Sequence, residues 1–534
     1  MAGGLLNLVS GGTQNSIMYG NPQKTYWSST YKQITNFGLQ NFRVDYEGLR
    51  QMQVSSDTVY AFKIKRYAEL LTQTYFVIQL PDIYSPVYIK DGIKYPYEFN
   101  WIKNLGAMMI RSIKFTIGGS LIQQMSGYDI VALANRDLNT SQKEKWNEMV
   151  GNIPELYDPV KTSGFYPNAY YTSDVNGAEP SIRGRQLRVP LPIWWGLNSQ
   201  QAFPLVCLQY NEIQIEVTLR PIRELFQIRD ITNTTGNTSS VIAPIMTIAE
   251  HQFYRFLQTP PTPPTPPTQD SIYTNTSTSW NENTHLSCTY GFLSEEEAIV
   301  FATKQQSYLI RELYDTRFYD VSITDKVWLQ NSTGLVLNWM ILFQRSDVSD
   351  RNEWCNFTNW AYDYLPSNIT NTSETDSLGN PIYQTGVYAD ENQKDILLNF
   401  GITFDGSVRE ETRQATIYKY EQQYLTIPGK GFSSLDGLYC YNFCLNTSPF
   451  MLQPSGAINL CKYSKIEFEF STITPSLNPN YTQLIICDPL LGGQIGVSKP
   501  VSKIYNYNFD LFVIEERYNV LTFVGGNAAL MSAR

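Results

Sequence analysis

The stretch Phe115-Thr-Ile-Gly-Gly-Ser-Leu121 has a counterpart later in the chain, Ile402-Thr-Phe-Asp-Gly-Ser-Val408. In both, alternating apolar and polar residues lead to a glycine, which is followed by serine and another apolar residue. This pattern is typical of a β-strand that ends in a hairpin turn. We expect Gly119 and Gly406 to occupy equivalent turns, because a positive φ angle favours glycine.

Two further echoes follow in the same order in both halves. Leu197-Asn-Ser199 matches Leu445-Asn-Thr447, and the alternating stretch 208–217 matches 460–470. Three echoes in order predict a duplicated β domain. The first half is about 40 residues longer between its first two landmarks, which indicates an inserted loop. Residues 140–185 are rich in Tyr, Phe, Pro, Gly and Asn, and we expect them to form an outward-facing tower on the first domain.

Composition favours the same fold class. With 534 residues, the chain is too long for one hydrophobic core and suits two all-β domains. Aromatic residues are 14% and charged residues only 17% of the chain, which favours sheet over helix. A net charge of −9 argues against a protein that coats nucleic acid.

Period-2 alternation predicts strands throughout the chain, and helices are predicted only in loops. The alternating sets are Tyr60/Phe62/Ile64, Phe76/Ile78/Leu80, Ile113/Phe115/Ile117, Ile213/Ile215/Val217/Leu219, Ile466/Phe468/Phe470 and Phe509/Leu511/Val513. Residues 335–343 (LVLNWMILF) are read as a strand buried on both faces. The patterns Ser141-x-x-Glu144 and Ser294-x-x-Glu297 predict short helices that begin with capping boxes.

The clearest boundary is the stretch TPPTPPTPPT at residues 259–268, which cannot form a central strand or a helix interior. A spacer between domains is favoured over a ligand for an SH3-like groove. The sequence therefore predicts four parts: an N-terminal arm at 1–24, a first jelly roll at 25–230, a Pro/Thr-rich linker at 231–286 and a second jelly roll at 287–534.

The sequence offers few residues that could serve in catalysis or metal binding. His251 and His285 are the only histidines, and motifs for nucleotide binding, zinc proteases or serine hydrolases are missing. Cys440, Cys444 and Cys461 suggest zinc, but the alternation around them favours buried cysteines in a strand. The pairs 410–411 and 515–516 are acidic and lie beside arginines, so ion pairs are favoured over a glycosidase dyad. We expect no enzyme activity and no cofactor.

The sequence also bears on where the protein is made. The first residues lack the features of a secretory signal, and no window reaches the ~18 apolar residues that a membrane span requires. The seven cysteines have no motif spacing, so we expect buried thiols and synthesis in a reducing cytosol.

Ten Asn-x-Ser/Thr sequons occur, at Asn139, Asn233, Asn237, Asn275, Asn331, Asn356, Asn368, Asn371, Asn446 and Asn480. Those at Asn233, Asn237, Asn275, Asn331, Asn356, Asn368 and Asn371 are the candidate glycosylation sites, in segments expected to be exposed.

Five blocks along the chain resemble the major capsid proteins of nucleocytoplasmic large DNA viruses, especially those of algae and protists. They are Gly20-Asn-Pro-Gln-Lys-Thr-Tyr-Trp27 with Thr35-Asn-Phe37, Gly118-Gly119 with Ile122, Val189-Pro-Leu-Pro-Ile-Trp-Trp195 with Phe203-Pro-Leu-Val-Cys-Leu-Gln-Tyr210, Pro454-Ser-Gly-Ala-Ile-Asn459, and Tyr518-Asn-Val-Leu521 with Gly525-Gly-Asn-Ala-Ala-Leu530. Departures from the family pattern, such as Ile193, Trp195 and Cys207, affect packing only.

The resemblance implies an all-β fold of two tandem eight-stranded antiparallel jelly-roll sandwiches with short loop helices. It implies a homotrimer that forms a pseudo-hexagonal capsomer in the icosahedral shell of a large double-stranded DNA virus. Implied partners are neighbouring capsomers and minor capsid proteins on the inner face, where the arm would lie. Neither direct nucleic-acid binding nor membrane insertion is implied. The chain would reside in the virion after synthesis and assembly in the host cytoplasm.

Two other classes remain open. A glycan-binding or cell-surface β-sandwich would use a similar fold, since a fold does not fix function. A hydrolase on a β scaffold would need a polar cluster in a cleft, which the sequence does not assemble.

Overall fold

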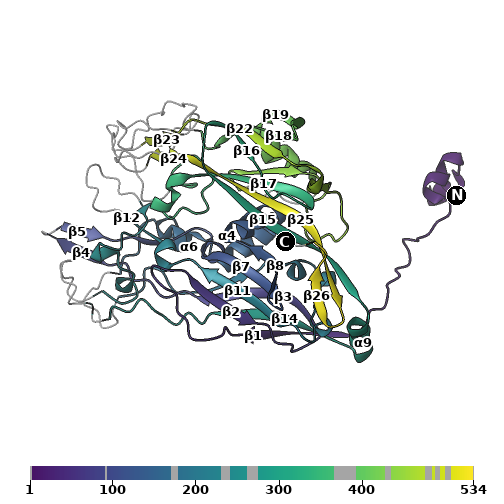
Figure 1. Cartoon of the computed structure of the whole chain (residues 1–534), viewed down its shortest axis with the longest axis horizontal. Helices are drawn as coiled ribbons and strands as arrows, with labels where there is room; N and C mark the ends of the chain where they lie inside the picture. The colour runs from purple at the N-terminus through teal and green to yellow at the C-terminus, as the bar shows by residue number, and fades with distance from the viewer. Residues whose placement is uncertain are drawn as a thin grey trace.

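The structure is a computed structural model that describes residues 3–90, 93–169, 178–229, 241–260, 273, 275–365, 393–426, 435–475, 484–487, 494–499 and 507–532. Figure 1 shows a body built of β-sheets, with the N-terminal segment reaching away from it beside α9 (Glu295–Thr303). The sheets of the body form two sandwiches.

The first sandwich has two antiparallel sheets. One contains β1 (Phe37–Val44), β14 (His285–Leu293), β3 (Leu70–Gln79), β9 (Gln186–Pro190) and β10 (Phe203–Pro204), in the order β1-β14-β3-β10, with β9 also on β3. The other has the order β2 (Thr58–Lys63), β11 (Ile213–Leu219), β7 (Ile110–Ile117) and β8 (Ser120–Met125). The side chains of β2 alternate in burial, because Tyr60 and Phe62 are fully buried while their neighbours Val59, Ala61 and Lys63 are more exposed.

The second sandwich repeats this arrangement. Its first sheet has the order β15 (Gln306–Val321), β25 (Phe509–Val524), β17 (Leu335–Arg345) and β20 (Leu438–Asn442), with β21 (Ile458–Asn459) on β17 and β26 (Asn527–Leu530) on β25. Its second sheet has the order β16 (Thr324–Trp328), β22 (Ile466–Thr472), β18 (Leu397–Phe404) and β19 (Ser407–Gln414).

The two sandwiches correspond strand by strand, in chain order and in sheet order. In one sheet of each sandwich, β1 corresponds to β15, β14 to β25, β3 to β17, β9 to β20 and β10 to β21. In the other sheet, β2 corresponds to β16, β11 to β22, β7 to β18 and β8 to β19. In each sandwich, two short strands share the eighth sheet position, since β9 and β10 both pair with β3, and β20 and β21 both pair with β17. The predicted fold of two tandem antiparallel sandwiches is confirmed.

The hairpins predicted from the sequence echo are equivalent. Each is a two-residue loop, with Ile117 paired to Ser120 in one and Phe404 paired to Ser407 in the other. Both loop residues have positive φ in each case, 56° and 82° in the first hairpin and 46° and 80° in the second. Such loops match the right-handed twist of the strands they join, and they favour Gly-Gly and Asp-Gly.

Smaller elements complete the fold. Short sheets are formed by β6 (Phe99–Trp101), β12 (Phe226–Arg229) and β13 (Val241–Ile242), by β4 (Val87–Lys90) with β5 (Ile93–Pro96), and by β23 (Leu484–Cys487) with β24 (Gln494–Lys499). The helices besides α9 are α1 (Gly3–Val9), α2 (Ser16–Tyr19), α3 (Leu105–Met108), α4 (Gly127–Asp137), α5 (Thr140–Val150), α6 (Pro154–Tyr157), α7 (Pro159–Ser163), α8 (Trp194–Leu197) and α10 (Gln422–Thr426), which continues a π-helical segment at Ile417–Glu421.

Strand pairing corrects the expected domain limits. Strand β14 lies between β1 and β3, so the chain returns to the first sandwich after residue 284, beyond the expected limit at residue 230. The repeated Pro-rich stretch had suggested that the first domain was already complete. Most of that stretch, and Asn233 and Asn237, lie outside the described residues.

Both predicted loop helices exist, but their predicted capping boxes do not form. Helix α5 begins one residue earlier than Ser141, with Asn139 as its N-cap and Gln142 as the reciprocal partner, and it ends at Gly151 as expected. Ser294 is the N-cap of α9, yet its side chain makes no capping hydrogen bond. A four-residue pattern therefore located each helix but not the groups that cap it.

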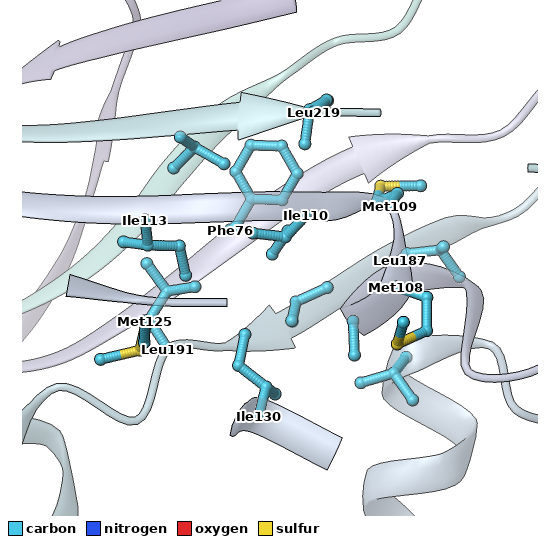
Figure 2. Close-up of a cluster of buried hydrophobic side chains, with 14 of the residues drawn as sticks. Phe76, Met108, Met109, Ile110, Ile113, Met125, Ile130, Leu187, Leu191 and Leu219 are labelled. Carbon is cyan, nitrogen blue, oxygen red and sulfur yellow. The ribbon is translucent and has the colours of Figure 1, made fainter. Parts of the chain in front are cut away.

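Two hydrophobic cores share the strands of the second sandwich. Leu511 and Val513 of β25 pack in a core inside that sandwich, whereas Phe512 and Ile514 belong to a core that is continuous with the first sandwich. Part of the latter core is shown in Figure 2, where Ile130 of α4 lies below Ile110 and Phe76. The same two-sided burial holds for residues 336–343 of β17, as their continuous apolar run predicted.

The inserted region of the first sandwich is more deeply packed than the predicted surface tower. Its described part consists mainly of α5, α6 and α7, and Trp146 and Val150 of α5 are buried in the shared core. The buried Tyr166 hydroxyl donates to the carbonyl of Phe99 at 2.7 Å. Tyr166, one of the aromatic residues that had indicated surface packing, therefore anchors the insert to the sandwich, while its neighbour Phe165 remains exposed. Residues 170–177 lie outside the described part.

Candidate functional site: the junction and the exposed apolar surfaces

Helix α4 is the central element of the junction between the sandwiches. It follows β8 directly and begins at a capping box, in which the Ser126 backbone amide donates to Asp129 at 2.7 Å. Its Tyr128 ring lies 5.4 Å from that of Phe512 in the second sandwich. Burial, then the nearby Asp315 carboxyl, raises the pKa of Asp129 well above its usual value. Sequence reasoning missed this helix, although Ser126-x-x-Asp129 is an N-terminal signal that an Asp-tolerant search would have found.

A buried charge network joins α4 to the second sandwich. The Arg136 guanidinium donates to Glu516 at 2.9 Å and to its neighbour Asp137 at 2.9 Å. Arg311 of β15 donates to the other oxygen of Glu516 at 3.1 Å, and the Asn338 amide donates to Glu516 at 2.7 Å. Burial alone would raise the pKa of Glu516, but the two arginines hold it at about 2. The network joins the two sandwiches directly, because Arg136 lies on α4 of the first and Glu516 on β25 of the second.

A second polar cluster lies where α5 and β12 meet the loop after β17. Lys103 forms a partly buried ion pair with Asp363 at 2.5 Å, and the Gln227 amide donates to Glu353 at 2.6 Å. Burial, then the Asp363 charge, raises the pKa of Glu353. Lys143 is buried with no hydrogen-bond partner for its amine, and burial lowers its pKa to about 7. These groups form contacts between segments from both halves of the chain.

An apolar groove of about 440 Å³ opens beside α4, α5 and β15. Its walls include Leu133, Trp146, Trp194, Phe450 and Met451. The charges of the junction network reach its floor, since Arg311 and Glu516 also line it. The groove therefore belongs to the junction and has no separate set of converging catalytic groups.

The residues considered for catalysis or metal binding are dispersed. In the part of the chain that the structure describes, no group of three or more His, Cys, Asp or Glu side chains could hold a metal ion. Cys440 and Cys444 are buried, as expected, while Cys461 is exposed. His251 accepts a hydrogen bond from the Ile245 amide at 3.0 Å. Glu515 and Glu516 lie in buried ion pairs, with Arg517 and Arg136, rather than in a cleft.

The candidate glycosylation sites differ in exposure. Asn275 and Asn331 are exposed. Asn356, which was expected in an exposed loop, is fully buried and donates to the Trp360 carbonyl at 2.8 Å, so the folded chain does not present it. The Asn-rich sequence around Asn356 had suggested an exposed loop, whereas the Asn356 amide stabilises a buried turn. Asn368 and Asn371 lie outside the described residues.

Apolar side chains are exposed on several of the described segments, including the following two. The first is the N-terminal segment, where Leu6, Leu8, Ile17 and Trp27 are exposed; strand β1 begins only at residue 37, so the arm is longer than the predicted 1–24. The second, which we call the β19 surface, consists of β19 and the helical residues 415–426 that follow it. Sequence reasoning did not find the β19 surface. Among the described helices, none is long and apolar enough to cross a membrane.

Comparison with known proteins identifies a family and relatives that match part of the chain. Residues 25–258 match the family described as "Major capsid protein N-terminus". The chain is 31% identical over 229 residues to the major capsid protein of Phaeocystis pouchetii virus, and 30% identical over 249 residues to that of Chrysochromulina ericina virus. Each match covers 42% of this chain and 42% of the relative, so less than half the length of these relatives is matched.

Solved structures extend the likeness to nearly the whole chain. VP54 of PBCV-1 is similar with a TM-score of 0.62 at 17% identity, over 96% of this chain and 100% of that chain. The Faustovirus major capsid protein is similar with a TM-score of 0.60 at 12% identity, over 94% of this chain and 93% of that chain. The fold is therefore the double jelly roll. The resemblance to major capsid proteins of large DNA viruses is confirmed.

Proposed function

We propose that this chain is the major capsid protein of a large double-stranded DNA virus. In this proposal its homotrimers form the pseudo-hexagonal capsomers of an icosahedral shell. The observation that carries the proposal is the strand-by-strand equivalence of the two sandwiches, which accompanies the family match of residues 25–258. Three chains around a three-fold axis would place six similar sandwiches in a ring, and such a unit can tile a shell.

The buried junction supports a structural role. A capsomer must keep its outline while it is packed against neighbours, and the Arg136–Glu516 network ties the two sandwiches of one chain together. The pKa shifts of Glu516 and Lys143 arise in such packed contacts, from paired arginines in the first case and from burial in the second. We therefore assign the chain a geometric function and no enzymatic one.

Location and partners follow from the proposal. The protein would be made in the host cytoplasm and reside in the virion, where it contacts other copies of itself and minor capsid proteins on the inner face. The apolar N-terminal arm is the segment we assign to that face. Among the candidate sequons that the structure describes, Asn275 and Asn331 are exposed, and sugars would be attached there.

The test is the assembly state of the purified full-length protein. Mass photometry at micromolar concentration should give a homotrimer, and negative-stain electron microscopy should give hexagonal particles. A stable monomer would contradict the proposal. A monomer retained on immobilised glycans would instead favour a glycan-binding β-sandwich.

A further inference from the structure

The segment that follows β17 packs against the first sandwich and is held there by hydrogen bonds. The Asn352 amide donates to the carbonyls of Arg223 and Phe226, at 2.8 Å each. The Trp354 indole donates to the Glu224 carbonyl at 2.8 Å. Side chains of this segment are therefore held in place beside those of the first half of the chain.

Within this contact, a lysine and an aspartate face each other. Lys103, between β6 and α3, has its Nζ 2.5 Å from Oδ2 of Asp363. The two side chains are only 19% and 14% exposed. The other carboxyl oxygen of Asp363 is buried, and it has no hydrogen-bond partner among the residues that the structure describes. This carboxyl is thus bound mainly by the lysine amine.

Aromatic rings lie around the lysine amine. Its Nζ is 4.9 Å from the ring centroid of Tyr364 and 5.6 Å from that of Tyr157. The two rings are in edge contact, with centroids 5.3 Å apart. Such surroundings limit the access of water and strengthen the electrostatic interactions among the groups inside.

A second carboxyl completes the cluster. Glu353 is 5% exposed, and it accepts a hydrogen bond from the Gln227 amide at 2.6 Å. Burial, then the charge of Asp363, raises the pKa of Glu353 to about 7, so this carboxyl can take up or release a proton near neutral pH. Burial would lower the pKa of Lys103, but the Asp363 charge raises it above its usual value.

We propose that Lys103 and Asp363 join in an isopeptide bond, which links the two halves of one chain covalently. The observation that carries the proposal is the contact between amine and carboxyl inside a cluster that also holds the buried Glu353. Amide formation from these groups needs no cofactor and no oxidant, because its by-product is water. The bond forms once in each chain, turns over no substrate and does not depend on assembly.

The reaction begins with proton transfer. Lys103 gives up a proton and Asp363 receives one through Glu353, which leaves a neutral amine and a neutral carboxyl. The Lys103 Nζ then attacks Cγ of Asp363, so that an N–C bond forms and the bond from Cγ to one carboxyl oxygen breaks. Of the three ammonium protons, one stays on the amide nitrogen and two leave with that oxygen as water. Glu353 gives a proton to Asp363 and recovers one from Lys103, so it is unchanged at the end.

The fold supplies the proximity that this reaction requires. Groups held in contact react as in an intramolecular step, at effective concentrations far above those in solution. The amide is also neutral, so its formation removes two charges from a poorly hydrated site. Lys419 and Asp395 form a comparable ion pair at 2.7 Å, but Asp395 is 38% exposed, and so is the second carboxyl near the amine, Asp436, at 42%. We expect that pair to remain ionic.

The test is the mass of the unaltered full-length protein. Intact-mass spectrometry under denaturing conditions should give a mass that is lower than that of the sequence by one water. Trypsin should not cleave after Lys103, and digestion should release residues 95–111 joined to residues 352–394. The peptides that contain Lys419 and Asp395 should be recovered separately. A full mass, with residues 95–103 and 352–394 recovered as separate peptides, would overturn the inference.

Three variants test the roles of the groups. Glu353→Gln keeps the size of the side chain and removes the carboxyl that exchanges protons, so it should retain the full mass. Lys103→Arg keeps a positive charge beside Asp363 and removes the reactive amine, so it should also stay unlinked. Lys419→Arg is the matched control and should be linked as the unaltered protein is. Linkage of Glu353→Gln to the unaltered extent would overturn the role of Glu353. A linked monomer would contradict the proposed function alone, and an unlinked trimer would contradict this inference alone.

Discussion

The two sandwiches have the same strand order, yet equivalent segments lie in opposite environments. Helix α4 is buried in the first, and the helical residues 415–426 are half exposed in the second. Likewise, the sheet face of β25 that meets α4 carries Phe512, Ile514 and the paired Glu516, whereas the equivalent face of β14 carries Ser287 and Thr289. The comparison teaches that duplication preserves topology, while the neighbour of each copy determines which side chains are buried.

The largest effect is expected from removing a buried charge of α4, the helix that packs against the second sandwich. Arg136→Met leaves Glu516 and Asp137 buried with one cationic partner fewer. The free energy of unfolding should fall by about 3–5 kcal/mol, because an uncompensated buried charge costs more than the ion pair contributed. Chemical denaturation at pH 7 measures the loss.

Arg183→Met is the control, since Arg183 pairs with Glu179 on the surface and both side chains are largely exposed. That pair should contribute no more than about 0.5 kcal/mol. A loss for Arg136→Met that matched the control would mean that the sandwiches are not held by this network. Glu516 should also make stability depend on pH. Its folded pKa of about 2 lies below the unfolded value, so it contributes to the free energy of unfolding above pH 4.5 and loses this contribution as the pH falls toward 2.

Removing the buried charge of Lys143 should raise stability, in contrast to removing that of Arg136. Its amine is buried without a hydrogen-bond partner beside Trp146, whose ring centroid lies 3.8 Å away. Lys143→Met keeps the apolar stem and removes the group that burial disfavours. We expect the variant to be more stable at pH 7 by about 2 kcal/mol, with calorimetry or chemical denaturation as the measurement.

The pH dependence gives a second readout. Burial lowers the folded pKa of Lys143 to about 7, so the unfolded chain binds a proton that the folded chain does not as the pH falls from 10.5 to 7. Stability from this residue therefore falls over that window and is level below it. In Lys143→Met this slope should disappear between pH 7 and 9. Lys145→Met, at an exposed position of the same helix, should leave both stability and slope unchanged.

The two hairpins should respond almost identically to one substitution. Gly119 and Gly406 have φ angles of 82° and 80°, and an added Cβ would meet no atom within 4 Å at either position. Valine at either site should therefore lower the free energy of unfolding by about 1–3 kcal/mol through backbone strain alone. Matching losses by thermal denaturation would support equivalence. A loss in only one of the two variants would mean that the turns are not under the same constraint.

Much of this fold could be predicted because the sandwiches obey alternation. Tyr60 and Phe62 face inward as their spacing predicts, and residues 336–343 are buried on both faces as their unbroken apolar run predicts. Helix α4 was missed although its sequence GYDIVALANRD has helical periodicity, because its N-terminal signal Ser126-x-x-Asp129 has Asp in the place of Glu or Gln.

Other features depended on contacts that are distant in sequence. Strand β14 joins the first sandwich only through pairing with β1 and β3, which are more than 200 residues away. Asn356 was expected to be exposed because it lies in an Asn-rich segment, but its amide is satisfied inside a buried turn. The β19 surface could not be predicted from one sequence, since its exposure follows from which sandwich lacks a neighbour.

The smallest effect on stability is expected from a deletion in the segment that precedes β1. The segments that precede the two equivalent strands β1 and β15 differ. Strand β15 is entered from α9, whereas β1 is entered from the long arm, whose described residues before Phe37 make no buried contact with the body. Deletion of residues 2–22 should therefore change the free energy of unfolding by no more than about 0.5 kcal/mol. Trimer mass should also be unchanged, because the deleted residues lie outside both sandwiches.

The same deletion should nevertheless prevent incorporation into shells. The deleted segment exposes Leu5, Leu6, Leu8, Val9, Ile17, Met18 and Tyr19, too few apolar groups to form a core of their own. Such a segment gains order when it binds another surface. The measurements are trimer mass, melting temperature and incorporation into particles. A truncated chain that fails to fold would place the arm in the domain core, and one that assembles normally would deny it a docking role. A well-folded trimer that does not enter shells is the result we expect.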